Sequence, residues 1–156
     1  MLRLIPPRAH RFGLRLAHAL RKRWWRWRKP RIAGCRVIAL DPKGYVLLVR
    51  HSYGTRRWTL PGGGLRRGED PLTAAARELL EETACRLDDP RLARIEPETL
   101  HGAINAVHVV AGRTASTPRA DGREILSAEF FALDALPEDC ATGLREAIER
   151  WIAVSE

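Results

Sequence analysis

Apolar residues recur at two different spacings along this chain, and the spacing changes near residue 33. In the first 31 residues the apolar positions lie on one arc of a helix: Phe12, Leu16, Leu20, Trp24 and Trp27. From residue 33 onward, short apolar runs alternate with turn sequences, as is typical of strands. The pattern predicts a leader helix in residues 1–31, ended by Pro30, and a second domain in residues 32–156.

Five strands are predicted in the second domain. Residues 35–40 and 45–49 flank the turn sequence Asp41-Pro42-Lys43-Gly44 and predict a β-hairpin. Asp88-Asp89-Pro90 is expected to break the chain. Three further strands are then predicted, at residues 92–101, 105–113 and 126–133, and in the last of these Phe130 and Phe131 should face opposite sides.

Two helices are predicted beside these strands. The later one follows from an apolar stripe made of Leu144, Ile148, Trp151 and Ile152. The earlier one should run from Pro71 to Ala84, after a glycine-rich turn and with Asp70 as its N-terminal cap. The order of strands, helix, strands, helix indicates an α+β fold with a mixed sheet between helices.

The earlier helix has two arcs of different chemistry. One arc is expected to be buried against the sheet: Leu72, Ala76, Leu79, Leu80 and Thr83. The other carries Glu78, Glu81 and Glu82. Carboxylates this close repel one another unless a cation lies between them, and oxygen ligands favour a hard ion, Mg²⁺ or Mn²⁺. The alternative is a solvated charged face, in which Arg77 pairs with Glu81.

The spacing around this helix resembles the Nudix box, G-x5-E-x7-R-E-U-x-E-E-x-G-U, where U is bulky and apolar. The matching residues are Gly63, Glu69, Arg77, Glu78, Leu79, Glu81, Glu82 and Cys85. Residues 58–63, WTLPGG, resemble the segment that usually precedes the box. So long a pattern is far more specific than a lone glycine motif. Ala84 stands where the family has glycine, which matters if that residue must be left-handed.

The resemblance implies a Nudix-like αβα sandwich that cleaves a diphosphate linkage in a nucleoside diphosphate joined to another moiety. It also implies roles for single residues. Glu78 and Glu82 would be inner metal ligands, Glu81 a further ligand, and the Gly63 carbonyl would complete the site. Glu69 and Arg77 would pair and support the helix. The general base comes from the box or from a later loop, where Glu124 is the candidate.

Two classes of function stay open. One is a metal-dependent diphosphohydrolase for a nucleotide-type small molecule, with 5′-end RNA as a variant substrate suggested by the basic leader. The other is a nucleotide- or RNA-binding regulatory module with little turnover, because fold and site chemistry can separate. Three mutually repelling carboxylates favour the enzyme.

The excess positive charge is confined to the leader. The chain has a net charge of +8, and residues 1–31 contain eleven Arg or Lys and no Asp or Glu. Residues 32–156 carry sixteen basic and nineteen acidic residues, a net charge of −3. A basic amphipathic helix with tryptophans can lie on an anionic membrane surface or bind nucleic acid. Alternatively, its apolar stripe packs on the acidic domain or on a second subunit in a homodimer.

The remaining signals concern compartment and loops. Cys35, Cys85 and Cys140 form no C-x-x-C pair, which indicates core thiols in a reducing compartment. No apolar run reaches the roughly 18 residues of a membrane span. We expect a cytoplasmic protein, with peripheral membrane association or organellar targeting as alternatives. In residues 50–57, three arginines and His51 either hold phosphates or are ordinary loop charges, and His101 and His108 are expected to be structural.

Overall fold

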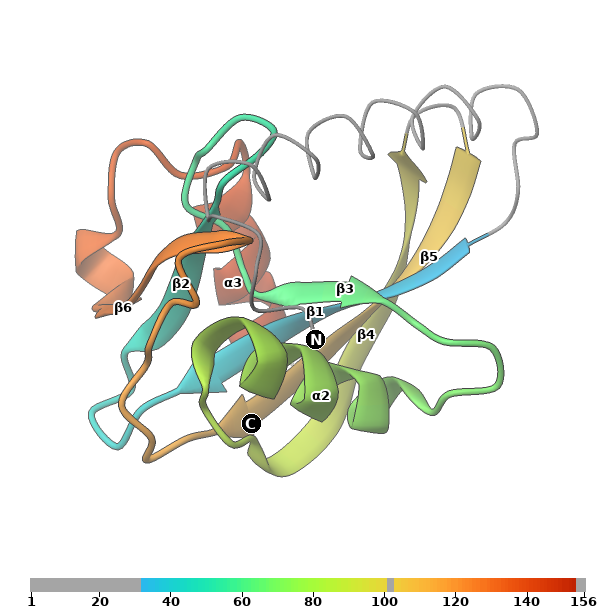
Figure 1. The fold of residues 1–156 in the computed structure, drawn as a ribbon, viewed down its shortest axis with the longest axis horizontal. Coiled ribbons are helices and arrows are strands. Elements are labelled where there is room, and N and C mark those ends of the chain that lie inside the picture. The colour runs from blue at the N-terminus through green and yellow to red at the C-terminus, as the bar shows by residue number, and fades with distance from the viewer. Residues whose placement is uncertain (1–31, 101–102, 154–156) are drawn as a thin grey trace, which may run out of the picture.

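The computed structural model describes residues 32–100 and 103–153. In this part of the chain one sheet is covered by two helices, α2 (Pro71–Thr83) on the face toward the viewer in Figure 1 and α3 (Leu144–Ala153) behind it. The prediction of an αβα sandwich is confirmed. The leader helix predicted within residues 1–31 lies outside the described residues and stays a prediction.

The sheet has six strands and is mixed. They are β1 (Ile32–Leu40), β2 (Val46–His51), β3 (Gly62–Gly64), β4 (Asp88–Leu100), β5 (Ala103–Arg113) and β6 (Ile125–Phe131). The order is β4-β5-β1-β2-β6, and β3 pairs with β1. β1 and β5 run parallel, and the other pairs are antiparallel. A short 3₁₀ helix, η1 (Leu133–Ala135), follows β6, so the last strand ends earlier than expected.

The predicted hairpin turn is present. The Asp41 carboxylate accepts the backbone N–H groups of Lys43 and Tyr45, both at 2.8 Å, and the Gly44 N–H donates to the Asp41 carbonyl at 2.9 Å. Gly44 has φ of +81°, which suits glycine. β1 and β2 pair at Leu40 and Val46 next to this turn.

Two expectations about irregular segments were wrong. The glycine-rich stretch at 62–64 is not a turn, because it pairs with β1 in the register Gly34–Gly64, Cys35–Gly63 and Arg36–Gly62. Asp88-Asp89-Pro90 does not break the chain either, since β4 begins at Asp88. Asp89 has φ of +48°, and the pairing of β4 with β5 shifts register between Asp88 and Arg91. A bulge therefore accommodates the proline at the start of an outer strand.

Alternating strand residues build two cores on opposite faces of the sheet. Along β1, Cys35, Val37 and Ala39 pack toward α2, whereas Ile38 packs toward α3. Phe130 and Phe131 contact different cores, as predicted. The stripe on α3 is also confirmed, because Leu144, Ile148 and Trp151 are buried. Burial of such side chains contributes about 1.5–3 kcal/mol each.

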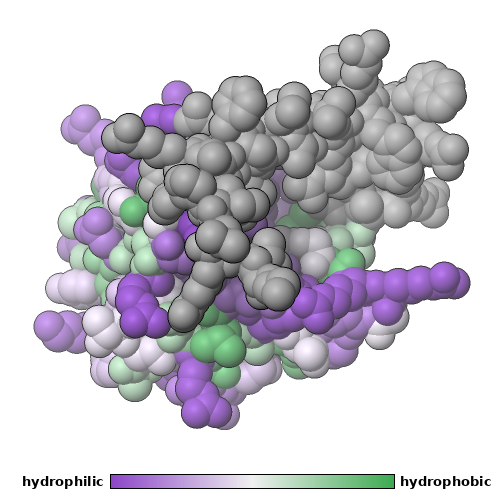
Figure 2. All heavy atoms as spheres, in the orientation of Figure 1, coloured by the Kyte–Doolittle hydropathy of each residue, from purple (hydrophilic) through white to green (hydrophobic). Residues whose placement is uncertain are grey.

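The surface outside these cores is mixed. On the face seen in Figure 2, hydrophilic and hydrophobic residues are intermingled outside the grey atoms. Among the residues whose side chains the structure describes, the exposed large apolar ones are Tyr45, Leu80, Leu92 and Ile95. Within residues 32–100 and 103–153, no helix is long and apolar enough to cross a membrane. Cys35 and Cys85 are free buried thiols, and Cys140 is free and partly buried.

Candidate active site

The helix that carries the carboxylates is fixed at both ends. At its start, the Asp70 carboxylate accepts the Thr73 N–H at 3.0 Å, and Pro71 occupies the first position. At its end, Ala84 is left-handed, with φ of 59° and ψ of 16°, and its N–H donates to the Leu80 carbonyl at 3.0 Å. The conformation expected from the family's glycine is therefore present, and here alanine adopts it.

The helix is rotated about its axis relative to the expected orientation. Leu80 was expected in the buried arc, but it is 53% exposed. The buried residues are Ala74, Ala75, Leu79, Glu82 and Thr83. At 100° per residue, Glu82 lies near the centre of this buried arc. Two alanines on the inner face leave room for the helix to approach the sheet with a carboxylate inside.

Glu82 is the buried member of the carboxylate set, at 8% exposure. Its Oε2 accepts the backbone N–H of Gly62 in β3, at 3.1 Å. Burial raises the pKa of Glu82 to about 8, and the charges of Glu78, Glu124 and Asp121 add to this rise. The Gly62 hydrogen bond acts in the opposite direction. This environment favours a proton or a cation on Glu82.

Glu78 lies against the backbone of Gly63. A Cβ atom at Gly63 would be 2.6 Å from the Glu78 carboxyl carbon, closer than side chains tolerate. Glycine at this position therefore lets the strand and the carboxylate approach each other. The approach also brings the Gly63 backbone beside the carboxylate, as expected if its carbonyl contributes to the same site.

Arg77 connects the helix to the segment that precedes it. Its guanidinium donates to both Glu69 oxygens, at 2.8 and 2.9 Å, and to Glu78 Oε1 at 2.7 Å. It also donates to the Gly64 carbonyl at 3.2 Å, and a longer 3.4 Å contact reaches Glu81. The hydrogen bonds from Arg77 lower the pKa of Glu69 to about 2. The expected Glu69–Arg77 pair is present, and so is the alternative partner, Glu81.

A cavity of about 180 Å³ lies beside this helix and is lined by acidic side chains: Glu78, Glu81, Glu82, Asp121 and Glu124. Ile125 completes its lining. The structure thus places four predicted site residues around one cavity, with Glu124 arriving from the loop before β6. Gly63, Glu69 and Arg77 are not among its lining residues. Arg77 is connected to the cavity through its bond to Glu78, and Glu69 is connected through Arg77.

Asp121 is the site residue that the sequence reasoning missed. Its Oδ1 accepts three backbone N–H groups, from Arg123 at 2.8 Å and from Glu124 and Ile125 at 3.0 Å. The carbonyl of Glu124 accepts the Ser52 N–H at 2.8 Å. These bonds fix the loop that brings both acids to the cavity. The sequence signal was an Asp-Gly turn three residues before the Glu124 candidate.

The donor set fits a hard divalent cation. Five carboxylates around one small cavity carry more negative charge than the neighbouring arginines balance, and a hard divalent cation would neutralise the excess. As the side chains stand, no three acidic, histidine or cysteine side chains in residues 32–100 and 103–153 converge on one point as an ion's ligands would. Arg77 pairs with Glu78, and Arg66 lies 3.6 Å from Glu81. A cation would thus compete with these arginines for the two carboxylates.

Two of the basic residues in the 50–57 loop, Arg50 and Arg57, contact side chains elsewhere in the protein. Arg50 pairs with Asp139, and its guanidinium lies 4.8 Å from the centre of the Trp58 ring. Arg57 donates to the Thr142 hydroxyl at 3.4 Å. Arg50 therefore has a structural role, which supports the reading of ordinary loop charges for that residue. His108 contacts the Gly34 carbonyl at 3.2 Å, as expected for a structural histidine.

Comparison with known proteins identifies the family. The family model described as the NUDIX domain matches residues 30–151. The chain belongs to the Nudix family. Among solved structures, it is similar to the MutT protein from Methanosarcina mazei Go1, with a TM-score of 0.69, 24% identity, and 82% of this chain and 97% of that chain covered. The NUDIX domain of Shewanella oneidensis NrtR complexed with ADP ribose has a TM-score of 0.68 and 15% identity, with 82% and 90% covered.

The similar sequences act on several substrates. An RNA pyrophosphohydrolase from Roseobacter denitrificans is 39% identical over 64 residues, which are 40% of this chain and 38% of that protein. The NAD-capped RNA hydrolase NudC from Edwardsiella ictaluri is 29% identical over 129 residues, 80% of this chain and 49% of NudC. Each of these matches therefore spans less than half the length of the relative. The family is established by the match of the NUDIX domain model.

Proposed function

We propose that this protein is a metal-dependent hydrolase that cleaves a diphosphate linkage in a nucleoside diphosphate joined to another moiety. The observation that carries the proposal is the acidic cavity beside α2, where the box carboxylates and two loop carboxylates meet. The names of the similar proteins support it, since they are an RNA pyrophosphohydrolase and a NAD-capped RNA hydrolase. Family and fold alone would not distinguish an enzyme from a binding module.

Four groups of this chain would hold the cation: the carboxylates of Glu78, Glu81 and Glu82, and the Gly63 carbonyl. The ion would be Mg²⁺ or Mn²⁺, which neutralises diphosphate charge and lowers the pKa of a coordinated water. Glu82 needs such a charge because it is buried beside other acids. Arg77 holds Glu78 through one carboxylate oxygen, Oε1, at 2.7 Å, so the cation would bind the other oxygen or displace the arginine.

The remaining residues would position groups and move protons. Glu69 holds the Arg77 guanidinium with two hydrogen bonds, and Arg77 orients Glu78. Glu124 is the proposed general base, which accepts the proton of the attacking water. Its loop is held by the Asp121 turn and by the Ser52 N–H, so the base lies on a fixed segment.

The second candidate is a regulatory module that binds a nucleotide with little turnover. The ADP-ribose complex of the similar NrtR domain is the observation in its favour. The intact set of box carboxylates favours the enzyme, because a binding site for an anionic nucleotide gains nothing from unneutralised acids. RNA 5′ ends are one substrate class to test. Binding of residues 1–31 to anionic membranes or nucleic acid, homodimer formation and a cytoplasmic location stay predictions.

The experiment is a substrate screen with the full chain in Mg²⁺ and in Mn²⁺. Nucleoside triphosphates, sugar nucleotides, dinucleotides and 5′-triphosphate RNA would be followed by ³¹P NMR. We expect cleavage between two phosphorus atoms for at least one class, with Glu82→Gln reducing kcat by about 100-fold or more. Glu149→Gln, on the exposed side of α3, is the control and should retain kcat. Wild-type turnover by Glu82→Gln would show that the metal assignment is wrong.

A further inference from the structure

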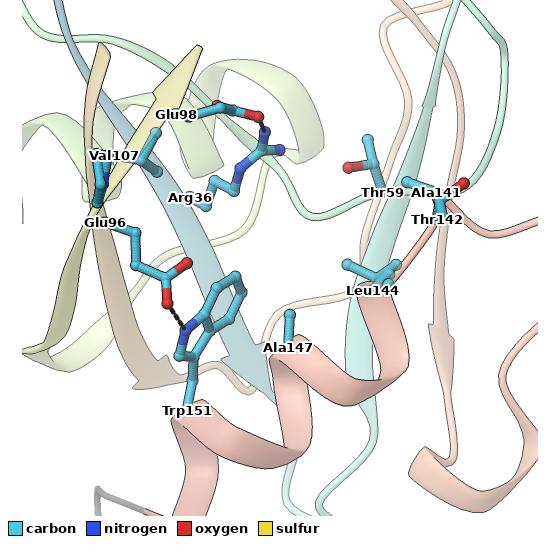
Figure 3. A pocket seen from close by; sticks show the side chains of 12 residues that line it. Arg36, Thr59, Glu96, Glu98, Val107, Ala141, Thr142, Leu144, Ala147 and Trp151 are labelled. Carbon is cyan, nitrogen blue, oxygen red and sulfur yellow. Dashed lines mark hydrogen bonds and ion pairs between the residues drawn. The ribbon is translucent and has the colours of Figure 1, made fainter. Parts of the chain in front are cut away.

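A second cavity, of about 320 Å³, lies on the opposite face of the sheet from α2. Figure 3 shows side chains from β1, β4, β5, α3 and two loops around one space. The apolar part of the lining includes Val107, Leu144, Ala147 and Trp151, and the polar part includes Arg36, Thr59, Glu96, Glu98 and Thr142. None of these residues has a part in the hydrolysis proposed above.

The two cavities lie on either side of one pair of strands. Arg36 lines the second cavity and pairs in register with Gly62, whose N–H binds Glu82 in the acidic cavity. The neighbouring pair is Cys35 and Gly63, and Gly63 lies against Glu78. Among the described strands, β3 pairs only with β1. A substrate that occupies both cavities would have to pass the edge of β3 that no described strand covers.

The polar side of the second cavity offers donors and acceptors together. Arg36 Nη2 donates to Glu98 Oε1 at 2.9 Å, and the two side chains are 35% and 38% exposed. The guanidinium has further N–H groups that can donate. The second oxygen of Glu98, Oε2, takes no part in the bond to Arg36. In Figure 3 the pair lies across the space from Thr59. This arrangement can bind a ring edge that carries an acceptor beside donors.

The apolar side has a fixed aromatic wall. Trp151 is 6% exposed, and its Nε1–H donates to Glu96 Oε1 at 3.2 Å. Arg94 holds the same Glu96 oxygen at 3.1 Å. The indole is therefore oriented by a carboxylate that is itself held in place, as Figure 3 shows for the Glu96–Trp151 contact. A planar heterocycle between this wall and the Arg36–Glu98 pair would be apolar on its faces and hydrogen-bonded at its edge.

We propose that this cavity binds the base of a guanine nucleotide, and that Glu98 with Arg36 selects guanine. The inference rests on the proposed function, because it names the nucleoside of that substrate. Guanine has two adjacent donors, N1–H and the 2-amino group, which match the two oxygens of one carboxylate, and its O6 can accept from Arg36. Hypoxanthine lacks the 2-amino group. Adenine in the same orientation sets its N1 acceptor against the carboxylate and its 6-amino donor against Arg36, so both bases lose at least one hydrogen bond to this pair.

The first test compares matched substrates with the full chain and Mg²⁺. We expect kcat/KM to be higher for guanosine triphosphate than for inosine or adenosine triphosphate by about tenfold, since one bond to a half-exposed charged group is lost. Glu98→Gln should bring the ratio close to one, whereas Glu149→Gln should leave it unchanged. Equal wild-type values for the three substrates, or a ratio retained by a folded Glu98→Gln protein, would overturn the inference.

The second test does not depend on turnover. The Trp151 indole ¹⁵N–H resonance, assigned with Trp151→Phe, would be titrated with guanosine and inosine 5′-monophosphates without metal. We expect the Trp151 resonance to shift at a guanosine monophosphate concentration about tenfold lower than the inosine monophosphate concentration that gives the same shift. This difference between the two nucleotides should disappear in Glu98→Gln and in Arg36→Lys. If none of the screened substrate classes is cleaved but this difference is found, the proposed function fails and the guanine site stands. If the three triphosphates are cleaved equally and the Trp151 resonance does not shift with either nucleotide, the guanine site fails and the proposed function stands.

Discussion

Arg77 donates to both carboxylate oxygens of Glu69, from Nε at 2.8 Å and from Nη2 at 2.9 Å. The remaining nitrogen, Nη1, donates to Glu78 at 2.7 Å. One planar group therefore links the segment before α2 to a proposed metal ligand. Because this geometry uses all sides of the guanidinium, a flexible ammonium group cannot replace it.

Arg77→Lys should therefore lower activity while keeping the charge. We expect a loss of about 10- to 100-fold in kcat or in the apparent affinity for Mg²⁺, as is typical when a residue that orients a ligand is removed. Steady-state kinetics across a Mg²⁺ titration would measure both. Arg67→Lys is the control, since Arg67 is exposed in the neighbouring turn and should tolerate the change. Equal behaviour of the two variants would contradict the orienting role.

Removal of metal should make stability depend on pH through Glu82. Its pKa is raised to about 8 in the folded chain from an ordinary value of 4.5, so the folded state binds the proton more tightly. In the metal-free protein, the contribution of Glu82 to the free energy of unfolding should be fully present below pH 4.5. It should be lost as the pH rises from 4.5 through 8.

Thermal melting in EDTA between pH 5 and 8.5 would test this linkage. We expect the midpoint to fall across that range in the wild type and to fall less in Glu82→Gln. Mg²⁺ at pH 8.5 should restore the wild-type midpoint, because the ion binds the folded, deprotonated site. A midpoint that rises equally with pH in both proteins would refute a raised Glu82 pKa.

Gly63→Ala should reduce activity without unfolding the protein. The added Cβ would lie 2.6 Å from the Glu78 carboxyl carbon, so the flexible end of Glu78 must move and its bond to Arg77 must lengthen. We expect kcat to fall by about tenfold or more, with a small change in melting temperature. Gly64→Ala is a matched control, because a Cβ there meets no atom within 4 Å. Comparable losses in both variants would point to a general effect on β3.

Ala84→Gly should be neutral or stabilising by up to about 1 kcal/mol. Alanine at φ of 59° has a steric cost that glycine lacks, although glycine also gains entropy in the unfolded chain. Urea unfolding of the variant would measure the difference. Ala76→Gly, inside the same helix, should instead destabilise by about 1 kcal/mol. Destabilisation of similar size at both positions would be inconsistent with the left-handed exit.

Deletion of residues 1–30 should leave kcat on a small nucleotide nearly unchanged, since every box residue lies beyond position 60. If the leader is interfacial, the deletion should abolish salt-sensitive binding to anionic vesicles, because each Lys or Arg near such a surface contributes about 1 kcal/mol. Vesicle flotation and thermal melting of both forms would measure this. A lowered melting temperature after truncation, with no flotation of the full chain, would instead favour packing of the leader on the domain or on a second subunit.

The sequence predicted the parts of the fold that local chemistry determines. The Asp70 cap, the Asp41 turn and the opposite directions of Phe130 and Phe131 each depend on near neighbours, and all three are present. The box spacing also placed Glu78, Glu81 and Glu82 beside one cavity. Their roles in catalysis stay predictions, because the spacing gives the positions and the chemical type of these side chains but does not show which ion or substrate they bind.

The features that were missed depend on contacts between distant segments. The helical pattern gave two apolar leucines, Leu79 and Leu80, and could not decide which one would face the sheet. The small side chains of Ala74 and Ala75 decided it by allowing close packing, and Leu80 was left exposed. Asp121 was overlooked because the conformation of the loop before β6, which the sequence pattern does not give, brings its carboxylate to the cavity. Arg36 and Glu98 come from strands 62 residues apart, and no local pattern joins them.

The alternation of side chains along β1 has a consequence for how this domain can be redesigned. Cys35 faces the acidic cavity's side and Arg36 faces the other cavity, so adjacent positions of one strand serve different ligand groups. Substitutions at even-numbered positions can alter one face while the odd-numbered positions keep the packing of α2. An insertion or deletion of one residue would exchange the two sets at once. A substitution in β1 therefore affects one face of the sheet, whereas a change in its length affects both.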